Sequence, residues 1–245
     1  MSRPAATVAL VTGATGGIGR QVASDLAGRG WTVLVAAHSA DVARAVAADL
    51  TDAGDVRALE TGLDASDDVA VAAVPQAVLA AAGRLDVLVN SSAAFAYWTE
   101  LASAADLDAA RAVMEARHFG PWRLTQVLLP LLCESPRPRV VNVSSGAGPY
   151  GHLPFGLTRR RPAAARRDAS EAALEALTAT LAADMAGSGV LVDAVCPGRT
   201  PTWPGGERRG AQQVAEAAAA LVLAAVLADE GRSAVFLRDG ELLPR

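Results

Sequence analysis

The chain of 245 residues contains no lysine, and all 22 of its basic residues are arginine. No lysine can therefore supply a tuned ammonium group to a reaction anywhere in this protein. Tyrosine is almost as scarce, because Tyr97 and Tyr150 are the only two phenols in the sequence. Two cysteines, Cys133 and Cys196, offer neither a disulfide framework nor a zinc spacing, which favours a reducing, cytoplasmic compartment.

An excess of basic charge is also missing. The formal net charge of -4 and the pI near 5.4 give no general attraction to nucleic acid or to anionic membranes, so we expect neither as a partner. No charged-then-apolar leader opens the sequence, and the longest apolar run, residues 217–228, is too short to span a bilayer. That run predicts a buried helix.

A glycine-rich turn follows the first predicted strand, residues 7–11, and opens a helix whose apolar residues recur at helical spacing. Gly13 allows a tight turn, Gly17 leaves room for a pyrophosphate, and Gly19 allows the helix to pack closely on the sheet. Strand, loop and helix stand in the order that a dinucleotide site requires. The residues expected to contact the nucleotide here are Gly13, Thr15, Gly16, Gly17, Ile18 and Gly19.

Strand and helix patterns alternate along the whole chain, which predicts one α/β domain over residues 1–245 with a Rossmann-type, doubly wound parallel sheet of about seven strands and helices on both faces. The expected strands cover residues 7–11, 31–36, 56–61, 84–90, 139–143, 190–195 and 234–237. Further helices are expected over residues 41–50, 69–82, 104–117, 122–133, 168–186 and 212–228, with 104–133 either one helix or two joined near Gly120-Pro121.

The end of the second strand lacks the acidic residue that holds the adenosine ribose in NAD-binding folds. Ala37-His38-Ser39 stands there instead, and His38 and Ser39 can donate to a 2′-phosphate. We therefore expect NADPH to be preferred over NADH, unless His38 is only an exposed loop residue. After the third strand, Asp64 can accept from the adenine amino group or, alternatively, cap the helix that starts near Asp67.

Two further segments follow strand ends where open α/β sheets bind ligands. The fourth strand ends in a polar turn beginning at Asn90, and the aromatic residues Phe95, Tyr97 and Trp98 that come next are either a substrate wall or a buried anchor. After the fifth strand, residues 146–167 are rich in Gly, Pro and Arg. This arginine cluster predicts either a lid-like insertion over about 149–167 or a solvated face.

Several motifs in order resemble those of the short-chain dehydrogenase/reductase family, and the resemblance covers essentially the whole chain. The motifs are Thr12 to Gly19 (TGxxxGIG), Val89 to Ala93 (VNNAG), Val140 to Ser145, Pro197 to Thr202 (PGxxxT) and Val235 to Gly240. The resemblance implies a nicotinamide cofactor, a small-molecule substrate and a homo-oligomer, dimer or tetramer, formed through helices 104–133 and 168–186. It adds Asn90, Pro197, Gly198, Thr200 and Thr202 to the expected cofactor contacts.

The catalytic positions depart from the family, in which a Tyr gives the proton, a Lys lowers the Tyr pKa, a Ser orients the carbonyl and an Asn anchors a water. Ser145 is the one expected catalytic residue that remains. Arg167 stands in the Tyr position, Glu171 in the Lys position and Arg117 in the Asn position. An arginine stays protonated near neutral pH and cannot act as the acid. Asp168 and Glu171 also read as a capping box for the helix that follows.

Other groups are candidates for the missing acid or for substrate contact. Tyr150 can swing towards Ser145 or line a lid, His152 in the lid is the better of two histidines, and His118 falls on a helix where a packing role is more common. The residues expected near the substrate are Phe95, Tyr97, Trp98, Tyr150, His152, Phe155 and Trp203, and no metal site is expected.

Three functions remain open at this stage. The first is an NAD(P)H-dependent ketoreductase acting on a bulky, aromatic polyketide, with Ser145 polarising the carbonyl and the proton coming from a neighbouring substrate phenol or from water. The second is a non-redox enzyme, such as a cyclase or dehydratase, that keeps the nucleotide as a structural group. The third is a sensor or scaffold. Thr202 favours the first, because the resemblance implies that it positions the nicotinamide carboxamide.

Overall fold

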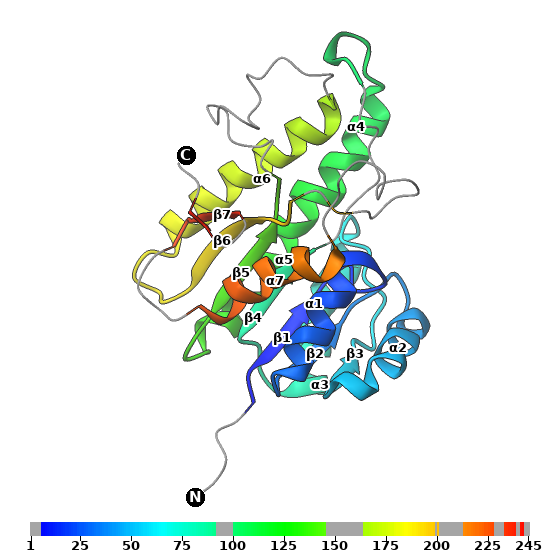
Figure 1. Cartoon of the computed structure of the whole chain (residues 1–245), viewed down its shortest axis with the longest axis vertical. Helices are drawn as coiled ribbons and strands as arrows, with labels where there is room; N and C mark the ends of the chain where they lie inside the picture. The colour runs from blue at the N-terminus through cyan, green and yellow to red at the C-terminus, as the bar shows by residue number, and fades with distance from the viewer. Residues whose placement is uncertain are drawn as a thin grey trace, which may run out of the picture.

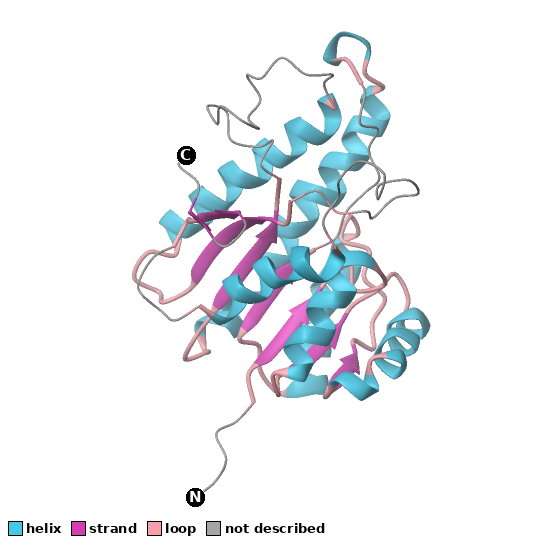
Figure 2. Ribbon diagram, viewed as in Figure 1, coloured by secondary structure: helices cyan, strands magenta, loops and turns pink. Residues whose placement is uncertain are grey.

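The computed structural model describes residues 6–91, 100–145, 164–198, 200, 213–227, 233–238 and 241–242. Within them, eight strands form one sheet in the order β3-β2-β1-β4-β5-β6-β7-β8. The first seven strands are parallel, and β8 pairs antiparallel with β7 (Figure 2). The expected doubly wound parallel sheet is therefore confirmed.

The strands are β1 Val8–Val11, β2 Thr32–Val35, β3 Val56–Ala58, β4 Val87–Asn90, β5 Arg139–Val143, β6 Leu191–Cys196, β7 Phe236–Arg238 and β8 Glu241–Leu242. The helices are α1 Gly17–Gly28, α2 Ala40–Asp49, α3 Asp68–Ala82, α4 Leu107–Met114, α5 Gly120–Cys133, α6 Ala165–Asp184 and α7 Val214–Val226. Short helical segments are η1 Thr51–Ala53, η2 Ala102–Ala104 and the π-helix η3 Glu115–Phe119.

The two faces of the sheet pack against different helices, because side chains alternate along each strand. In β1, Ala9 and Val11 join a core cluster with α1, α2 and α7, whereas Val8 and Leu10 join a second cluster with α3, α5 and α6. Figure 1 shows these helix layers on either side of the sheet. Helix α7 contains most of the apolar run predicted to be a buried helix, and it packs on α1. Among the described helices, none combines the length and apolarity needed to cross a membrane.

Helices α4 and α5 are joined without a break, although a joint near Gly120-Pro121 was one expectation. The connection is the π-helix η3, and Pro121 lies in the first turn of α5, where the missing N–H costs least. Gly120 is also in close contact with a neighbouring loop, because a Cβ atom there would lie 2.8 Å from the Cβ atom of Ala65. The missing side chain at Gly120 therefore lets this helix pass close to the loop after β3.

The expectation that Asp168 and Glu171 form a capping box at the start of a helix is wrong. Helix α6 starts at Ala165, and its N-cap residue, Ala164, makes no side-chain cap bond. Glu100 takes over that role, because its carbonyl oxygen accepts from the Ala165 N–H at 3.2 Å and its carboxylate pairs with Arg166. Residues 165–167 therefore belong to helix α6, and residues 149–163 of the expected lid-like insertion lie outside the described residues.

The last parallel strand also begins later than the expected residue 234. Ala234 has a φ angle of +64°, in the left-handed region, which is incompatible with an extended strand. Its N–H instead donates to the Val192 carbonyl oxygen at 2.8 Å. The strand therefore starts at Phe236, where the backbone is extended again.

Charged side chains tie the amino ends of the strands together. Asp86 accepts from the Val8 N–H at 2.8 Å and pairs with Arg84 and with the Ser135 hydroxyl. Further along the sheet, buried Arg139 donates to Asp193 at 3.2 Å and to the Leu227 carbonyl oxygen at 3.0 Å. Polar contacts therefore link the strands at the amino edge of the sheet. The candidate site lies at the opposite, carboxyl edge.

Candidate active site

The glycine-rich turn lies at the carboxyl edge of the sheet, between β1 and α1. Gly13 and Gly17 have φ angles of +66° and +54°, which residues with a side chain rarely adopt. Gly19 cannot carry a side chain without a backbone shift, because a Cβ atom there would lie 2.5 Å from the Gly13 carbonyl oxygen. Thr15 is exposed at the turn, whereas Ile18 packs partly against the core. The first N–H groups of α1 and its positive dipole end suit a pyrophosphate.

Asn90, at the end of β4, is oriented by a buried chain of hydrogen bonds. Its Nδ2 donates to Asn142 Oδ1 at 2.9 Å, and Asn142 Nδ2 donates to the Thr178 hydroxyl at 2.9 Å. These hydrogen bonds leave Asn90 Oδ1 directed away from Asn142, and that buried oxygen has no hydrogen-bond partner in the described part of the protein. Next to it, the Ser91 N–H donates to the Thr12 hydroxyl at 3.0 Å, which ties the turn after β4 to the end of β1.

These features fit a nicotinamide nucleotide. The turn from Gly13 to Gly19 provides a cradle that a Cβ atom would fill, and Asn90 Oδ1 is a buried acceptor suited to an N–H or O–H donor of a ligand. The residues after β6 continue the same edge, where Gly198 has a φ angle of +72° and Thr200 is buried. Pro197 lies between β6 and Gly198, as expected for the late motif.

The adenosine end of the expected site is formed by the loops after β2 and β3. His38 is exposed, and its carbonyl oxygen would lie 2.7 Å from a Cβ atom on Gly62, so the two loops pack backbone to backbone. Ser39 is the N-cap of α2, where its hydroxyl oxygen accepts from the Val42 N–H at 3.3 Å. The hydroxyl hydrogen of Ser39 therefore remains a donor for a ligand on this loop.

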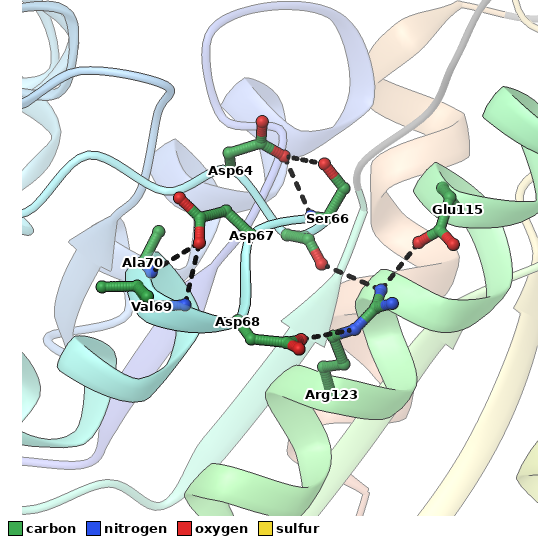
Figure 3. Close-up of polar contacts among 9 residues, drawn as sticks. Asp64, Ser66, Asp67, Asp68, Val69, Ala70, Glu115 and Arg123 are labelled. Atoms are coloured by element: carbon green, nitrogen blue, oxygen red, sulfur yellow. Dashed lines mark hydrogen bonds and ion pairs between the residues drawn. The ribbon is translucent and has the colours of Figure 1, made fainter.

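Asp64 is not a helix cap, so that alternative is wrong. Asp67 caps α3 by accepting from the Val69 and Ala70 N–H groups (Figure 3). Asp64 instead accepts from the N–H and the hydroxyl of Ser66 at 2.9 and 2.6 Å, and these bonds hold the pKa of its carboxyl below the usual range. Asp64 is therefore an ionised acceptor on the loop after β3.

Arg123 links that loop to the π-helix, and sequence reasoning missed it. Its guanidinium lies 2.7 Å from Glu115 and 3.0 Å from Asp68, and it donates to the Ala65 carbonyl oxygen at 3.3 Å (Figure 3). Glu115 and Arg123 are eight residues apart, about 12 Å along a helix axis, so their spacing gave no signal for this contact. The contact with the loop depends on the fold.

Arg167 reaches Ser145 at the end of β5. The Arg167 Nη2 donates to the Ser145 hydroxyl oxygen at 2.8 Å, although 22 residues separate the two in the sequence. Both side chains lie on the carboxyl edge of the sheet, Ser145 two residues after β5 and Arg167 in the first turn of α6. The Arg167 side chain is only 15% exposed. The guanidinium thus stands against the serine hydroxyl.

Glu171 lies one helical turn after Arg167 and joins it to Arg117. Glu171 Oε1 is 2.5 Å from Arg117 Nη1 and 3.9 Å from Arg167 Nε. Arg117 comes from the π-helix, a bulge of the kind that often occurs at functional sites. Burial raises the pKa of the Glu171 carboxyl, and the Arg117 and Arg167 guanidinium groups oppose that rise. Arg117, Glu171, Arg167 and Ser145 therefore form one connected group, called here the carboxyl-edge network.

Other polar and aromatic side chains lie next to the carboxyl-edge network. The Ser144 hydroxyl donates to Glu175 at 2.9 Å, and Asp168 is buried in the first turn of α6. His118 packs edge-on against Phe119 and Trp122, burial lowers the pKa of its imidazole, and its Nδ1 has no hydrogen-bond partner among the described residues. A packed position fits the expectation that His118 is a packing residue.

Several expected site residues lie outside the described residues, and their contacts stay predictions. They are Phe95, Tyr97, Trp98, Tyr150, His152, Phe155, Thr202 and Trp203. The residues that the structure does bring to the carboxyl edge come from seven separate segments of the chain: the turn after β1, the loops after β2 and β3, the ends of β4, β5 and β6, and the start of α6.

Comparison with known proteins identifies the family to which the chain belongs. The family model for short chain dehydrogenases matches residues 7–212. The chain belongs to the short-chain dehydrogenase family. Members of this family are oxidoreductases that bind a nicotinamide cofactor, so the nucleotide site predicted from the glycine-rich turn agrees with the family.

Curated relatives of this short-chain dehydrogenase include proteins named ketoacyl reductases, one of them of a polyketide synthase. The chain is 36% identical over 208 residues to the granaticin polyketide synthase putative ketoacyl reductase 2 of Streptomyces violaceoruber, covering 81% of this chain and 75% of that protein. It is 33% identical over 199 residues to a putative ketoacyl reductase of Streptomyces coelicolor, covering 80% and 71%. These relatives support an oxidoreductase role in secondary metabolism.

Solved structures of short-chain dehydrogenases share the fold. A short-chain dehydrogenase from Streptomyces avermitilis is 30% identical with a TM-score of 0.77, covering 97% of this chain and 89% of that one. The Pseudomonas aeruginosa RhlG/NADP active-site complex is 27% identical with a TM-score of 0.80, covering 97% and 96%. An NAD+-bound xylitol dehydrogenase, 20% identical with a TM-score of 0.81, shows the fold alone.

Proposed function

We propose that this short-chain dehydrogenase is an NADPH-dependent ketoreductase that acts on a bulky aromatic polyketide, such as an angucyclinone, without a protein tyrosine as acid. The observation that carries the proposal is the contact between Arg167 and Ser145, 2.8 Å, at the position where the family resemblance expects a tyrosine. Arg167 occupies that position but has no proton to give near neutral pH. The proton therefore comes from the substrate or from water.

The remaining groups are suited to this chemistry. Bound NADPH would be held by the turn from Gly13 to Gly19 and by Asn90, and it would supply a hydride to the carbonyl carbon. Ser145 donates its hydroxyl hydrogen to the carbonyl oxygen, which receives the carbonyl electron pair. A phenol beside the carbonyl on the substrate transfers its proton to that oxygen, becomes a phenolate, and later recovers a proton from water. Atoms and charge balance without a protein acid.

The relatives support the polyketide part of the proposal. Two of the Streptomyces proteins quoted above are named ketoacyl reductases, one of them within granaticin polyketide synthesis. Aromatic polyketides carry phenols next to ketones, which is the arrangement that a substrate-derived proton requires. The arginine-only, alanine-rich composition of the chain is typical of GC-rich coding sequences.

The preference for NADPH follows from the loop after β2. His38 is exposed there, Ser39 keeps a donor hydrogen, and Asp41, two positions further on, is paired with Arg44 at 2.6 Å. The substitution His38→Asp places a carboxylate beside the 2′-phosphate and should weaken NADPH binding by about tenfold while sparing NADH. Calorimetry with both nucleotides measures this. Equal affinity of the unchanged protein for NADH and NADPH would contradict the preference.

The reaction is tested with 8-hydroxy-1-tetralone, which has a phenol beside its ketone, and with its methyl ether, 8-methoxy-1-tetralone. We expect NADPH oxidation with the phenol and a rate at least about 10²-fold lower with the ether, the size of effect expected from loss of a general acid. Equal rates would show that the proton does not come from the neighbouring phenol. Nucleotide binding without reduction of either ketone, or of larger polycyclic hydroxy ketones, would refute the ketoreductase and favour a non-redox role.

A further inference from the structure

The direction of the hydrogen bond between Arg167 and Ser145 fixes the role of the serine. A guanidinium has donors only, so the Ser145 oxygen accepts and its own hydrogen is directed to another group. A hydroxyl that accepts from a charged donor is polarised and becomes a better donor itself. Arg167 therefore determines how Ser145 meets a carbonyl oxygen.

The position of Arg167 is itself fixed by buried charges. Glu171, 3% exposed, lies between Arg167 and Arg117, and its closer contact is with Arg117 at 2.5 Å. Because Arg117 takes the shorter contact with the carboxylate, Glu171 holds Arg167 at 3.9 Å without drawing it away from Ser145. The other carboxylates on this side of α6 are Asp168, which is buried, and Glu175, which accepts from Ser144.

A guanidinium so placed brings a permanent positive charge to the point where negative charge develops. When a ketone is reduced, the carbonyl electron pair moves onto the oxygen that Ser145 contacts. If a neighbouring phenol then gives its proton to that oxygen, the negative charge passes to the phenol oxygen. Fixed donors and cations aimed at such charge stabilise it most effectively where water is scarce.

We infer that Arg167 has two roles in this reaction: it holds the Ser145 hydroxyl as donor to the carbonyl, and its charge stabilises the phenolate that the substrate forms. The inference rests on the proposed function and narrows the substrate class to ketones with an ionisable oxygen beside the carbonyl. The carboxyl-edge network thus replaces the proton donor by a cation that lowers the pKa of a phenol belonging to the substrate.

Binding alone tests this charge stabilisation. The probe is 1-hydroxyanthraquinone, whose visible absorption band shifts when its phenol ionises, titrated with pH in the presence of NADP+ and protein. We expect the bound phenol to ionise at a lower pH than the same phenol in buffer. Its methyl ether, 1-methoxyanthraquinone, controls for binding. Ionisation at the same or a higher pH in the unaltered protein would overturn the inference without any variant being needed.

Three single variants and one double variant then separate the charge of Arg167 from its shape and test its link to Ser145. Arg167→Met removes both charge and donors and should return the ionisation of the bound dye to its value in buffer, whereas Arg167→Lys should keep most of the shift. With 8-hydroxy-1-tetralone, Arg167→Met should lower kcat by about 10²-fold with little change in KM or in NADPH affinity. Ser145→Ala should lower kcat similarly, and the double variant should be no worse than the single ones.

The outcomes distinguish this inference from the proposed function. Losses that multiply in the double variant, or a normal kcat in Arg167→Met, would overturn the inference while leaving the ketoreductase intact. Failure of the unaltered protein to reduce any ketone would refute the proposed function, and the dye titration would still report whether Arg167 stabilises a bound phenolate. Retained NADPH affinity shows in each case that the variant is folded.

Discussion

Strand β5 begins with the buried Arg139, and the partly buried Arg167 lies beyond its carboxyl end, where it has a different role. At the amino end, Arg139 donates to Asp193 and to the Leu227 carbonyl oxygen, and Asp193 also accepts from the Val235 N–H at 3.1 Å. Within the described residues, that network therefore reaches backbone groups of other segments. At the carboxyl end, the contacts that start from Arg117 and Glu171 end on the hydroxyl of Ser145.

The comparison shows that pairs of an arginine and a carboxylate can serve either stability or chemistry. Arg139 and Asp193 side chains are 5% and 0% exposed and join β5, β6 and the segment after α7. Arg117 and Arg167 side chains are 17% and 15% exposed and lie at the edge where ligands bind in open parallel sheets. Arg139 is therefore more deeply buried than Arg117 and Arg167, and among the described contacts the two networks also differ in the groups that they reach.

The largest expected effect comes from breaking the amino-end network. Asp193→Ala leaves Arg139 buried without its carboxylate and the Val235 N–H without its acceptor, so we expect a loss of about 3–5 kcal/mol in the free energy of unfolding. Denaturant titration measures this. Asp49→Ala is the matched control, because it removes a largely exposed pair with Arg20 and should cost less than about 1 kcal/mol. Equal losses for both variants would contradict the structural role of Asp193.

An intermediate effect is expected at the carboxyl end, where Arg117→Gln should cost about 3 kcal/mol near neutral pH. Arg117 lowers the pKa of Glu171, so its removal raises that pKa in the folded protein. A carboxyl whose folded pKa lies above its unfolded value loses its contribution to stability as the pH rises through the folded pKa. The deficit relative to the unaltered protein should therefore be small near pH 4.5 and grow with rising pH.

Unfolding of Arg117→Gln is measured over a series of pH values, with Arg20→Gln as a control whose partner is mostly exposed. A deficit that stayed constant or shrank with rising pH would mean that Arg117 does not neutralise Glu171. We also expect Arg117→Gln to keep its nucleotide affinity. Asp193→Ala should instead lose nucleotide affinity, because it destabilises the fold.

The smallest effect concerns His118, the neighbour of Arg117 on η3. Burial lowers the pKa of its imidazole, and Glu115 and the Ala173 backbone partly offset this. A histidine with a depressed folded pKa contributes stability above its unfolded pKa of about 6.5, and this is lost as the pH falls through the folded pKa. His118→Gln should therefore narrow the drop in melting temperature between pH 7 and pH 5. An unchanged drop would show that His118 is not the group responsible.

The sequence was most informative where the site is made from backbone. The glycines of the turn could be interpreted directly from the sequence. Gly13 and Gly17 have positive φ angles and Gly19 has no room for a Cβ atom, so almost no other residue fits these positions. Parallel strands were likewise visible as β-branched apolar runs. The ends of elements were less predictable: the start of α6 depends on a carbonyl of Glu100, which is 65 residues away in the sequence.

Side-chain networks were predictable only in part. Motif spacing placed Arg117, Arg167 and Glu171 at the catalytic positions, but it could not show that a guanidinium would contact Ser145 across a gap of 22 residues. The link from Arg123 to the Ala65 loop, and the pairing of Arg166 with Glu100, depend on where separate helices and loops meet. Long flexible side chains have many rotamers, and only the folded surroundings select one.

The π-helix η3 has a consequence for how this protein can change over evolutionary time. A π-helical turn holds one residue more than an α-helical turn, so deleting one residue from Glu115–Phe119 would let the segment revert to α-helix and would shift residue 117 relative to Glu171. Point substitutions change which side chain stands at position 117 but leave its place opposite Glu171 unaltered. Substitutions can therefore replace the side chain at position 117 while its backbone position is kept. An insertion or a deletion in the π-helix would instead move that position away from Glu171.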